Sequence, residues 1–473
     1  MGFWYTPAEG YPQEYHEMKS NQTLTTLSLL ALATGLAIAE PDLIVSDITS
    51  ATTFGAVDGK IAYSFGTTIC NIGNSEAAWI NGTNENPLIS QTLYRLVDGQ
   101  IQQIGIGFAH YTTPPLSGNA CGLGCTPAGF NALGAGCSTT SSSTIHGLQS
   151  TMGPRTEINP FTGDYPYPFT SIGQTGDAIY KRLQVNIADI SDPNALYFVE
   201  TQVITSAETT PATRANNVSY RQVTFTPGSA TASVVGPTYT EQPAIFAWRD
   251  HGNGIGMPNS EVMIIEITIP GDGIIHAGSL VTDLGDGTFR YDYAIHNQNA
   301  HNAISSLMVP GAGIFDGMTN RIFHGVDYHD DVDGLIDDSD IINRTSTINT
   351  YWAQSWTPAN QLQEDDNAIR WGTTYSYSFT APNEPRNYQS VLHYAVPGAG
   401  GSPVPLVIET VTPIQGDVCF IDLNGDGVLN FYEVSTFLSS FSAQAPSVDF
   451  VPDGMFNFFD VSSFLNALTA GCP

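Results

Sequence analysis

The sequence predicts a mostly β protein, in which two β-sandwich-like domains are followed by a small α-helical module. Apolar and polar side chains alternate along runs such as residues 61–65, 289–295 and 375–379, which is the two-residue period of a half-buried strand. Short turn sequences separate these runs. A sustained 3.6-residue period is missing from residues 40–397 and is expected near the C-terminus.

The individual strands follow from the same rules. Residues 94–96 and 101–104 flank an Asp-Gly turn and predict a β-hairpin. Residues 262–269 are apolar almost without interruption and end at a Pro-Gly-Asp-Gly turn, so they predict a fully buried strand. Many short strands separated by such turns are typical of β-sandwiches.

Two stretches rich in glycine and polar residues mark the expected domain boundaries. The first is 249–254, between two β-rich halves, and the second is the Pro/Gly-rich stretch 397–403. The expected organisation is a first β-sandwich-like domain at 40–250, a second at 251–397, a linker at 398–416 and the helical module at 417–473.

The charge balance limits the classes of partner. The 473 residues carry a net charge of −31, yet only 12% of them are charged, against about 25% in an average protein. Lys19, Lys60 and Lys181 are the only lysines. A nucleic acid or an anionic membrane is therefore excluded as a partner, because each requires clustered basic side chains. The 41% hydrophobic content excludes disorder, and cations are the natural partners of such a chain.

The N-terminal segment is interpreted as a targeting sequence. Residues 18–39 contain Lys19, an apolar stretch and the small-x-small sequence Ala37-Ile38-Ala39, the layout of a secretory signal peptide. A buried N-terminal helix is the alternative. Residues 1–17 precede Met18 as a doubtful N-terminal extension. No other stretch is long and apolar enough to span a membrane, so we expect a secreted, extracellular or cell-surface protein without a transmembrane segment.

The six cysteines suit an oxidising compartment, where disulfides form. The first domain contains four of them, which allow three pairings: Cys70, Cys121, Cys125 and Cys137. Cys121 and Cys125 have the spacing of half a zinc site, but no second close pair of ligands completes it. Disulfides are therefore expected, with the pairing left open.

A twelve-residue loop near the C-terminus has the spacing of an EF-hand calcium site. Its glycine at the sixth position supplies the sharp turn, and an amphipathic helix follows it. Calcium is a hard cation that takes six to eight oxygen ligands. The expected ligands, at positions 1, 3, 5, 7, 9 and 12, are Asp422, Asn424, Asp426, Val428 through its carbonyl, Asn430 and Glu433.

The whole loop–helix unit is repeated 27 residues later, which makes the signal specific. Val451 occupies the third position of the second loop, where a side-chain oxygen belongs, so we expect two calcium sites of unequal affinity. The expected ligands of the second loop are Asp449, Asp453, Met455 through its carbonyl, Asn457 and Asp460.

This tandem unit resembles a dockerin, and Cys419 with the terminal Gly-Cys-Pro resembles the GC-type subclass. The resemblance covers residues 417–473 and implies a dockerin-like module with tandem calcium loops that anchors an exported protein to a partner domain or cell-surface scaffold. Dockerins usually have small polar residues at loop positions 10 and 11. Here aromatic pairs occupy them, at 431–432 and 458–459, and these aromatics belong either to the core or to an apolar docking face.

A Cys419–Cys472 disulfide would join the ends of this module. It would contribute about 4 kcal/mol in the chain-entropy model. So small a core needs both the disulfide and the metal, and the module contains no lysine or arginine to offset its carboxylates.

Two shorter resemblances concern the β domains. Residues 41–45 and 70–74 resemble the opening of immunoglobulin-like domains in secreted bacterial adhesion proteins. Residues 291–297 and 367–373 resemble a β-sandwich of exported bacterial proteins of unassigned function. Neither resemblance implies a catalytic residue.

A second acidic segment is a further calcium candidate. When residues 327–340 are aligned on Gly334, four aspartates fall at ligand positions 3, 5, 9 and 12: Asp331, Asp333, Asp337 and Asp340. The first position is His329, a poor calcium ligand, and a solvated acidic loop is the alternative. His324, Asp327 and His329 could form a transition-metal set, although a surface coincidence is the simpler interpretation.

No catalytic motif is present. Glu157, Glu200 and Glu266 are expected to be surface or turn carboxylates. Single histidines are expected to be structural: His110, His146, His276 and His393.

We therefore expect an exported, calcium-binding extracellular protein with a binding, adhesive or structural role, in which the C-terminal module binds a scaffold protein or copies of the same chain. The alternative is a secreted polysaccharide-acting hydrolase with the same anchor. A glycan-binding protein without catalysis is a third possibility, and it predicts an exposed aromatic platform drawn from Trp248, Trp352, Trp356 and Trp371.

Overall fold

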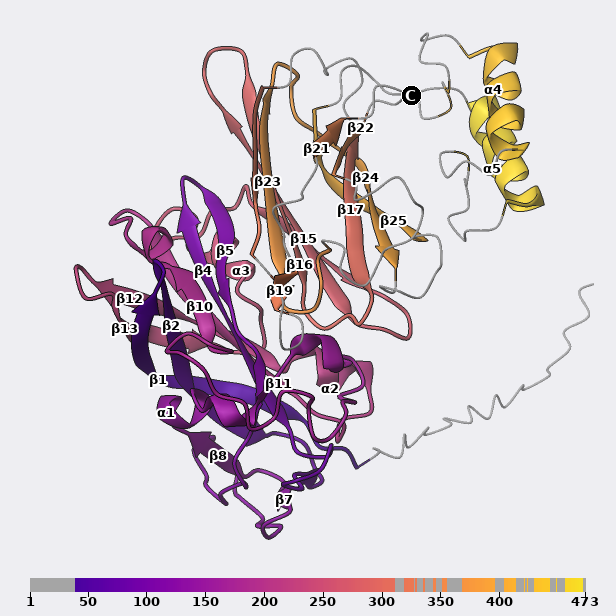
Figure 1. Cartoon of the computed structure of the whole chain (residues 1–473). Helices are drawn as coiled ribbons and strands as arrows, with labels where there is room; N and C mark the ends of the chain where they lie inside the picture. The colour runs from indigo at the N-terminus through magenta and orange to yellow at the C-terminus, as the bar shows by residue number, and fades with distance from the viewer. Residues whose placement is uncertain are drawn as a thin grey trace, which may run out of the picture. The chain divides into compact units, whose positions relative to one another are not determined.

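The computed structural model is mostly β, with several sheets and a small helical part at the C-terminus (Figure 1), which confirms the predicted class. The chain divides into two units, residues 1–38 and 39–473. The structure describes residues 39–310, 319–326, 328–329, 335–336, 343–345, 351–354, 368–395, 404–413, 421, 423, 429–442, 448 and 456–470. Nearly all of the expected signal peptide lies outside these residues. No helix in the described part of the chain is long and apolar enough to cross a membrane.

The first half is built on one large antiparallel sheet. Its main strands are, in spatial order, β1 (Leu43–Val57), β2 (Lys60–Asn71), β10 (Leu183–Asn186), β5 (Gln100–Ile106), β4 (Leu88–Val97), β11 (Leu196–Ile204), β12 (Val218–Thr226) and β13 (Thr231–Tyr239). Short strands extend it or pair beside it: β6 (Ala109–Tyr111), β8 (Ser138–Ser141), β9 (Met152–Gly153), and the pair β3 (Ala77–Ala78) and β7 (Ala132–Leu133). Short helices connect the strands: α1 (Ser143–His146), α2 (Pro211–Ala215), α3 (Phe246–Asp250), and 3₁₀ turns at Gln149–Thr151, Arg155–Glu157 and Ile187–Ile190.

Two-residue turns fix the register of this sheet. Asp98 and Gly99 have φ values of 50° and 78°, and they connect β4 to β5 with Val97 paired to Gln100. Positive φ at both central residues is the requirement of a type I′ turn, whose twist suits a hairpin. The predicted hairpin at 94–104 is confirmed.

The large sheet curls until its two end strands meet. The backbone N–H of Ile48 in β1 donates to Thr238 Oγ1 in β13 over 3.1 Å, and the N–H of Ala232 in β13 donates to Thr53 Oγ1 over 3.0 Å. Side chains from all eight main strands form one buried cluster inside the curl. One curled sheet thus encloses the first core. Side chains along its strands alternate with the same two-residue period as in a sandwich.

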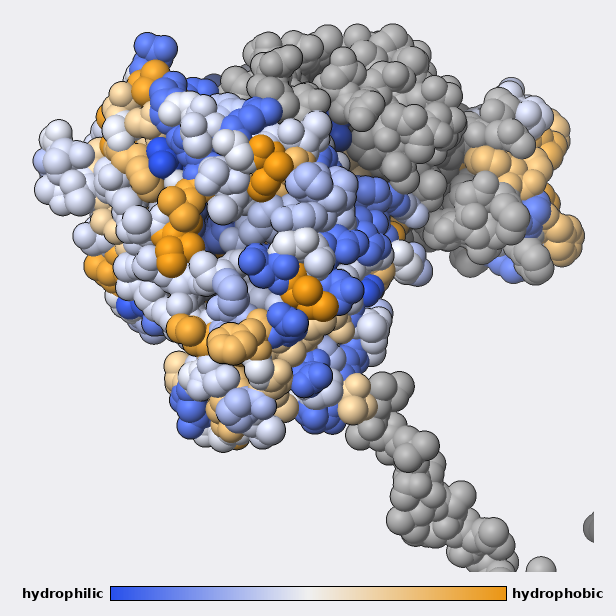
Figure 2. All heavy atoms as spheres, turned by 60° about the horizontal axis from the view of Figure 1, so that its bottom comes forward, coloured by the Kyte–Doolittle hydropathy of each residue, from blue (hydrophilic) through white to orange (hydrophobic). Residues whose placement is uncertain are grey.

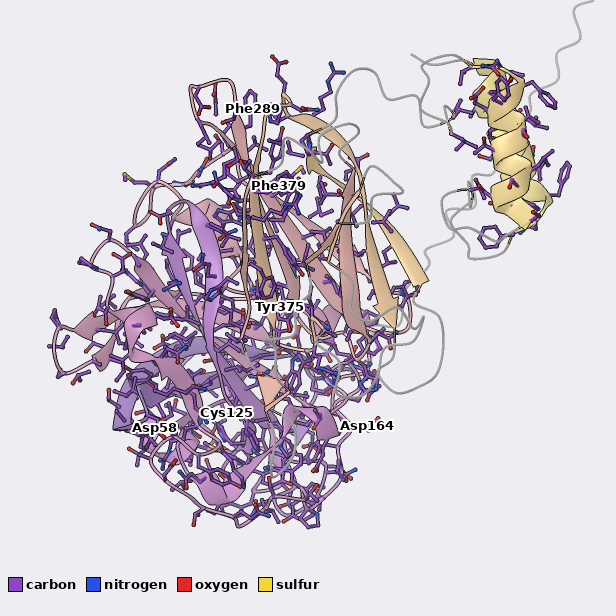
Figure 3. All side chains as sticks on the ribbon, turned by 45° about the horizontal axis from the view of Figure 1, so that its top comes forward. Asp58, Cys125, Asp164, Phe289, Tyr375 and Phe379 are labelled. Atoms are coloured by element: carbon purple, nitrogen blue, oxygen red, sulfur yellow. A yellow bond between two sulfur atoms is a disulfide. The ribbon has the colours of Figure 1, made fainter. Side chains whose placement is uncertain are left out.

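The second half is a sandwich of two sheets. The first sheet contains β14 (Met263–Thr268), β15 (Ile274–Asp283), β16 (Phe289–Asn297), β23 (Thr374–Ala381) and β18 (Thr319–His324). The second contains β21 (Asn343–Thr345), β22 (Tyr351–Gln354), β17 (Ala303–Pro310), β24 (Arg386–Ala395) and β25 (Val404–Thr412), and β19 (Tyr328–His329) pairs with β20 (Leu335–Ile336). The shared core joins Tyr375 and Phe379, which lie along β23 (Figure 3), to Leu307 and Ile408 of the facing sheet.

The predicted fully buried strand at 262–269 is instead an edge strand. β14 ends the order of its sheet, and Glu266 at its centre is exposed. Ile265 and Ile267 pack against the sandwich core, whereas Ile264 packs against the cluster around Trp248. Its isoleucines thus pack on both faces of the strand, which gives the apolar pattern of a central strand although the strand is only partly buried.

The outer face of the first sandwich sheet packs against the curled sheet through polar contacts. The Gln103 side chain accepts the N–H of Thr374 over 2.6 Å and donates to the carbonyl of Gly372 over 2.9 Å. Ser376 Oγ donates to the carbonyl of Ile101 over 2.6 Å. Trp248 of α3 is fully buried beside these contacts and packs close to Gly278. The two β regions therefore share a buried interface that is crossed by side-chain hydrogen bonds.

Candidate functional site

Two helices form the C-terminal module, at the positions that the repeat predicts: α4 (Phe431–Ser442) and α5 (Phe458–Ala470). Their core contains four buried apolar residues, which are two pairs separated by the 27-residue repeat: Ile421 with Val448, and Phe437 with Phe464. The rings of Phe437 and Phe464 stack with centroids 4.1 Å apart. The duplicated sequence is thus a duplicated packing unit.

At the start of each helix, a carboxylate accepts the backbone N–H of the asparagine three residues before it. Glu433 Oε2 accepts the backbone N–H of Asn430, and Asp460 Oδ2 accepts that of Asn457 over 2.9 Å. Asn430 Oδ1 also accepts the N–H of Tyr432 over 2.8 Å. These contacts form a capping box, which satisfies backbone donors at a helix start. If these side chains served only to cap the helices, these contacts would be sufficient.

Burial and charge go beyond what a cap requires. Glu433 and Asp460 are both fully buried, whereas capping carboxylates are usually solvated. No described group donates to Glu433 Oε1, although that oxygen is buried. An unpaired buried carboxylate is costly, and the module has no lysine or arginine that could compensate it. A cation at this position would supply the missing partner.

The donor set fits calcium as far as it is described. Position 12 of an EF-hand-type loop is a carboxylate that uses both oxygens, and Glu433 has one oxygen engaged in capping and one without a partner. Within the described residues, no three His, Cys, Asp or Glu side chains lie close enough to hold a metal. The other expected ligands lie outside those residues: Asp422, Asn424, Asp426, Val428, Asp449, Asp453 and Met455. Calcium binding therefore stays a prediction.

The aromatic residues at loop positions 10 and 11 face solvent. Phe431 is 76% exposed, Tyr432 67% and Phe458 75%, and the side chain of Phe459 is not described. Leu438 and Leu465, one repeat apart, are exposed on the same two helices. Figure 2 shows hydrophobic residues on the surface of these helices, while polar and apolar residues mix on the β regions in view. For these three aromatics, the core interpretation is wrong.

Other predicted metal and disulfide positions lie outside the described residues: Asp331, Asp333, Asp337, Asp340, Cys419 and Cys472. Of the transition-metal set, His324 is described. Its Nε2 lies 2.8 Å from the carbonyl oxygen of Gln103, and burial lowers its pKa. This contact gives His324 a structural role that requires no metal.

The four cysteines of the first half form two disulfides, Cys70–Cys121 and Cys125–Cys137. This is one of the three pairings that the sequence left open. The first disulfide ties a long loop to β2, and the second closes a short loop within it. The segment between β6 and β8 contains few backbone ladders, so these disulfides compensate for its small core.

Glu200 is buried, which corrects its interpretation as a surface or turn carboxylate. It lies in β11, where Oε2 accepts the N–H of Ala244 over 2.7 Å and Oε1 accepts the hydroxyl of Thr92 over 3.2 Å. Burial raises the pKa of Glu200 to about 7. Its other neighbour is His296, whose Nε2 lies 4.0 Å from Oε2.

His296 belongs to a polar row across the outer face of the first sandwich sheet. Glu266, His276, His296 and Thr374 are directly paired on four adjacent strands. Glu266 Oε2 lies 3.8 Å from His276 Nε2, the two imidazole centroids are 6.0 Å apart, and His296 Nδ1 lies 2.9 Å from Thr374 Oγ1. Sequence spacing could not reveal this row, because it exists only through strand register.

The tryptophan platform expected of a glycan-binding protein is not formed by Trp248 or Trp371, which are both buried. Trp371 Nε1 donates to Gln202 Oε1 over 2.8 Å, and Trp248 Nε1 donates to the carbonyl of Gly99 over 2.7 Å. The side chains of Trp352 and Trp356 are not described.

No family model matches the sequence, and no curated protein matches it. Among solved structures, one similar chain comes from a structure described as "Complete structure of manganese lipoxygenase of Gaeumannomyces graminis and partial structure of zonadhesin of Komagataella pastoris". It is 10% identical over 78% of this chain and 94% of that chain, with a TM-score of 0.14. A likeness this low indicates neither a shared fold nor a shared function.

Proposed function

We propose that this is an exported, calcium-binding extracellular protein with a binding, adhesive or structural role, and that its C-terminal module anchors it. In this proposal, calcium orders the two loops and fixes the starts of α4 and α5. Asn430 and Glu433 would contribute oxygens to the first site, and Asn457 and Asp460 to the second. Calcium would supply the positive charge that offsets the buried carboxylates, since the module has no lysine or arginine.

The buried Glu433 carboxylate carries this proposal. One of its oxygens has no described partner, and the module around it is entirely acidic or neutral. Without a cation, a buried carboxylate oxygen that lacks a partner would destabilise the folded module. A hard divalent cation offsets the charge of both capping carboxylates and accepts oxygen ligands from the two loops.

The exposed aromatics support the anchoring role. Phe431 and Phe458 occupy equivalent positions in the two repeats and project from the helix starts. Exposed aromatic rings beside metal-ordered loops form a surface suited to a partner protein. The proposed partner is a scaffold protein or another copy of the chain, bound through this aromatic face only when calcium is present.

Isothermal titration of the purified, metal-depleted chain with calcium tests the proposal. We expect two binding events, with the site of the first loop the tighter one. Glu433→Gln should weaken that site at least roughly tenfold, because position 12 supplies two of its oxygens. Glu409→Gln, an exposed carboxylate in β25, is the matched control and should leave both events unchanged. Heats identical in Glu433→Gln and the wild type would refute the proposal.

Analytical ultracentrifugation and negative-stain imaging, each with and without calcium, address the anchoring role. Ordered filaments or discrete oligomers that form only with calcium would support self-association. In that case Phe431→Ser combined with Phe458→Ser should abolish assembly and leave calcium affinity intact. If the chain stays monomeric, the partner must be a separate scaffold protein.

A further inference from the structure

A cavity of about 410 Å³ lies beside the polar row, between the end of the curled sheet and the first sandwich sheet. Its lining includes Thr240, Gln242, Phe246, Glu266, His276 and Gln298. These residues come from the segment after β13, from α3, from β14 and β15, and from the turn after β16. The volume falls within the usual range of small-molecule sites, about 300–1,000 Å³.

His276 lies in the wall of this cavity, next to Glu266. Its side chain is buried, its Nδ1 has no hydrogen-bond partner, and its Nε2 lies 3.8 Å from Glu266 Oε2. The Phe246 ring and the imidazole pack edge to face, with centroids 5.3 Å apart. A buried polar atom without a partner is uncommon in native structures. The protein encloses this nitrogen, and the exposed carboxylate of Glu266 is the group that the cavity presents to a ligand.

The lining groups restrict the class of ligand. No lysine or arginine lines the cavity, so a phosphate or carboxylate ligand would lack a counter-charge. The guanidinium of Arg249 already lies over the Phe246 ring at 4.9 Å, which opposes a second cation at that ring. The remaining groups are amides, carboxylates, a hydroxyl and an imidazole, and they can both donate and accept hydrogen bonds.

We propose that this cavity binds an uncharged sugar unit of monosaccharide size. Glu266 accepts hydrogen bonds from ligand hydroxyls, His276 positions the Glu266 carboxylate from below, and Phe246 offers an apolar surface to the C–H groups of the ring. Gln298 donates its amide to the carbonyl of Ala215 over 2.7 Å, so its side-chain oxygen is held in place as an acceptor. This site is separate from the calcium module and does not depend on it.

Saturation-transfer NMR and titration calorimetry with the full chain test the assignment. The neutral probes are the methyl glycosides of glucose, galactose, mannose and N-acetylglucosamine, and the charged probes are choline and glucuronate. At least one neutral glycoside should bind with a dissociation constant on the order of 1 mM, as is usual for so few contacts. Glucuronate and choline should not bind.

Variants connect the binding to this cavity. Glu266→Ala should weaken the sugar at least roughly tenfold, since a hydrogen bond to a charged acceptor contributes more than this factor. Glu266→Gln, which keeps an acceptor oxygen, should weaken it less. Glu261→Gln, an exposed carboxylate just before β14, is the control and should bind normally. His276 is buried, so the folding of His276→Gln is first compared with that of the wild type by circular dichroism. If His276→Gln does not fold, Gln242→Ala is used in its place.

Three outcomes would overturn the assignment. No neutral glycoside binds, or a glycoside binds equally well to Glu266→Ala. In the third, choline binds, loses its binding in Glu266→Gln, and no sugar binds, which would identify a cation site instead.

Discussion

The rings of Phe437 and Phe464 stack almost in parallel, with centroids 4.1 Å apart and planes inclined by 6°. The two residues are equivalent in the sequence repeat, so each helix contributes the same side chain to one shared contact. Both are fully buried at the centre of a module with few other buried apolar residues. This pair therefore holds the two repeat units together.

Phe437→Ala should open the module. Loss of a buried phenylalanine costs about 3–5 kcal/mol, which is large for so small a core. Hydrogen exchange in peptides from α4 and α5 should rise by several orders of magnitude, while the β regions keep their protection. Leu438→Ala, next to it but exposed, should change little, and equal effects of the two substitutions would contradict the role of the stack.

The two calcium sites should differ in affinity. Val451 replaces a ligand in the second loop, so Asp460→Asn should remove a weak binding event and Glu433→Gln a strong one. Calorimetry that finds two equal, tight sites in the wild type would contradict this prediction.

Glu200 should make stability decrease with rising pH. Its pKa in the folded protein is about 7, above the ordinary 4.5, so the folded state binds a proton more tightly than the unfolded state. This contribution is present below about pH 4.5 and is lost as the pH rises to about 7, a change on the order of 3 kcal/mol. Urea unfolding at pH 5 and 8 should show a smaller fall in Glu200→Gln than in the wild type or Glu261→Gln. Equal falls would contradict the assignment.

His110 should act in the opposite direction. Burial lowers its pKa to about 4, and it packs against the buried His146, with ring centroids 4.2 Å apart. The folded state therefore resists protonation, and stability present above about pH 6.5 is lost as the pH falls toward 4. Between pH 6.5 and 4.5, the melting temperature of His110→Gln should fall less than that of the wild type. A fall equal to that of the wild type would show that other groups cause the acid sensitivity.

The disulfide Cys125–Cys137 should stabilise the loop region before β8. In the chain-entropy model, a bridge of this span contributes about 3 kcal/mol. Replacement of both cysteines by serine should expose this region to limited proteolysis first, and the sandwich core should remain intact. Cleavage rates like those of the wild type would mean that backbone contacts alone hold the loop.

Sequence reasoning predicted what depends on local pattern. The mostly β class, the hairpin at Asp98-Gly99 and the two C-terminal helices follow from alternation, turn residues and helical period. The position of β14 at a sheet edge did not, because its isoleucines pack on both faces against different parts of the chain. A local pattern reports burial of a side chain and not the neighbour that buries it.

The polar row was missed for a related reason. Glu200 and His296 are almost a hundred positions apart in sequence and meet only because two sheets pack together. Nothing local distinguishes Glu200 from a solvent-facing carboxylate on an alternating strand. The calcium loops could be predicted from the sequence because their expected ligands lie within twelve residues, so the signal is contained in one segment.

The most direct measurement is hydrogen exchange, followed by mass spectrometry, of the full chain in calcium and in chelator. The account predicts strong protection of α4 and α5 with calcium, its loss in chelator, and no difference in the β regions. Glu433→Gln in calcium should resemble the wild type in chelator. Equal protection of both helices in calcium and in chelator would contradict the proposal that calcium organises this module.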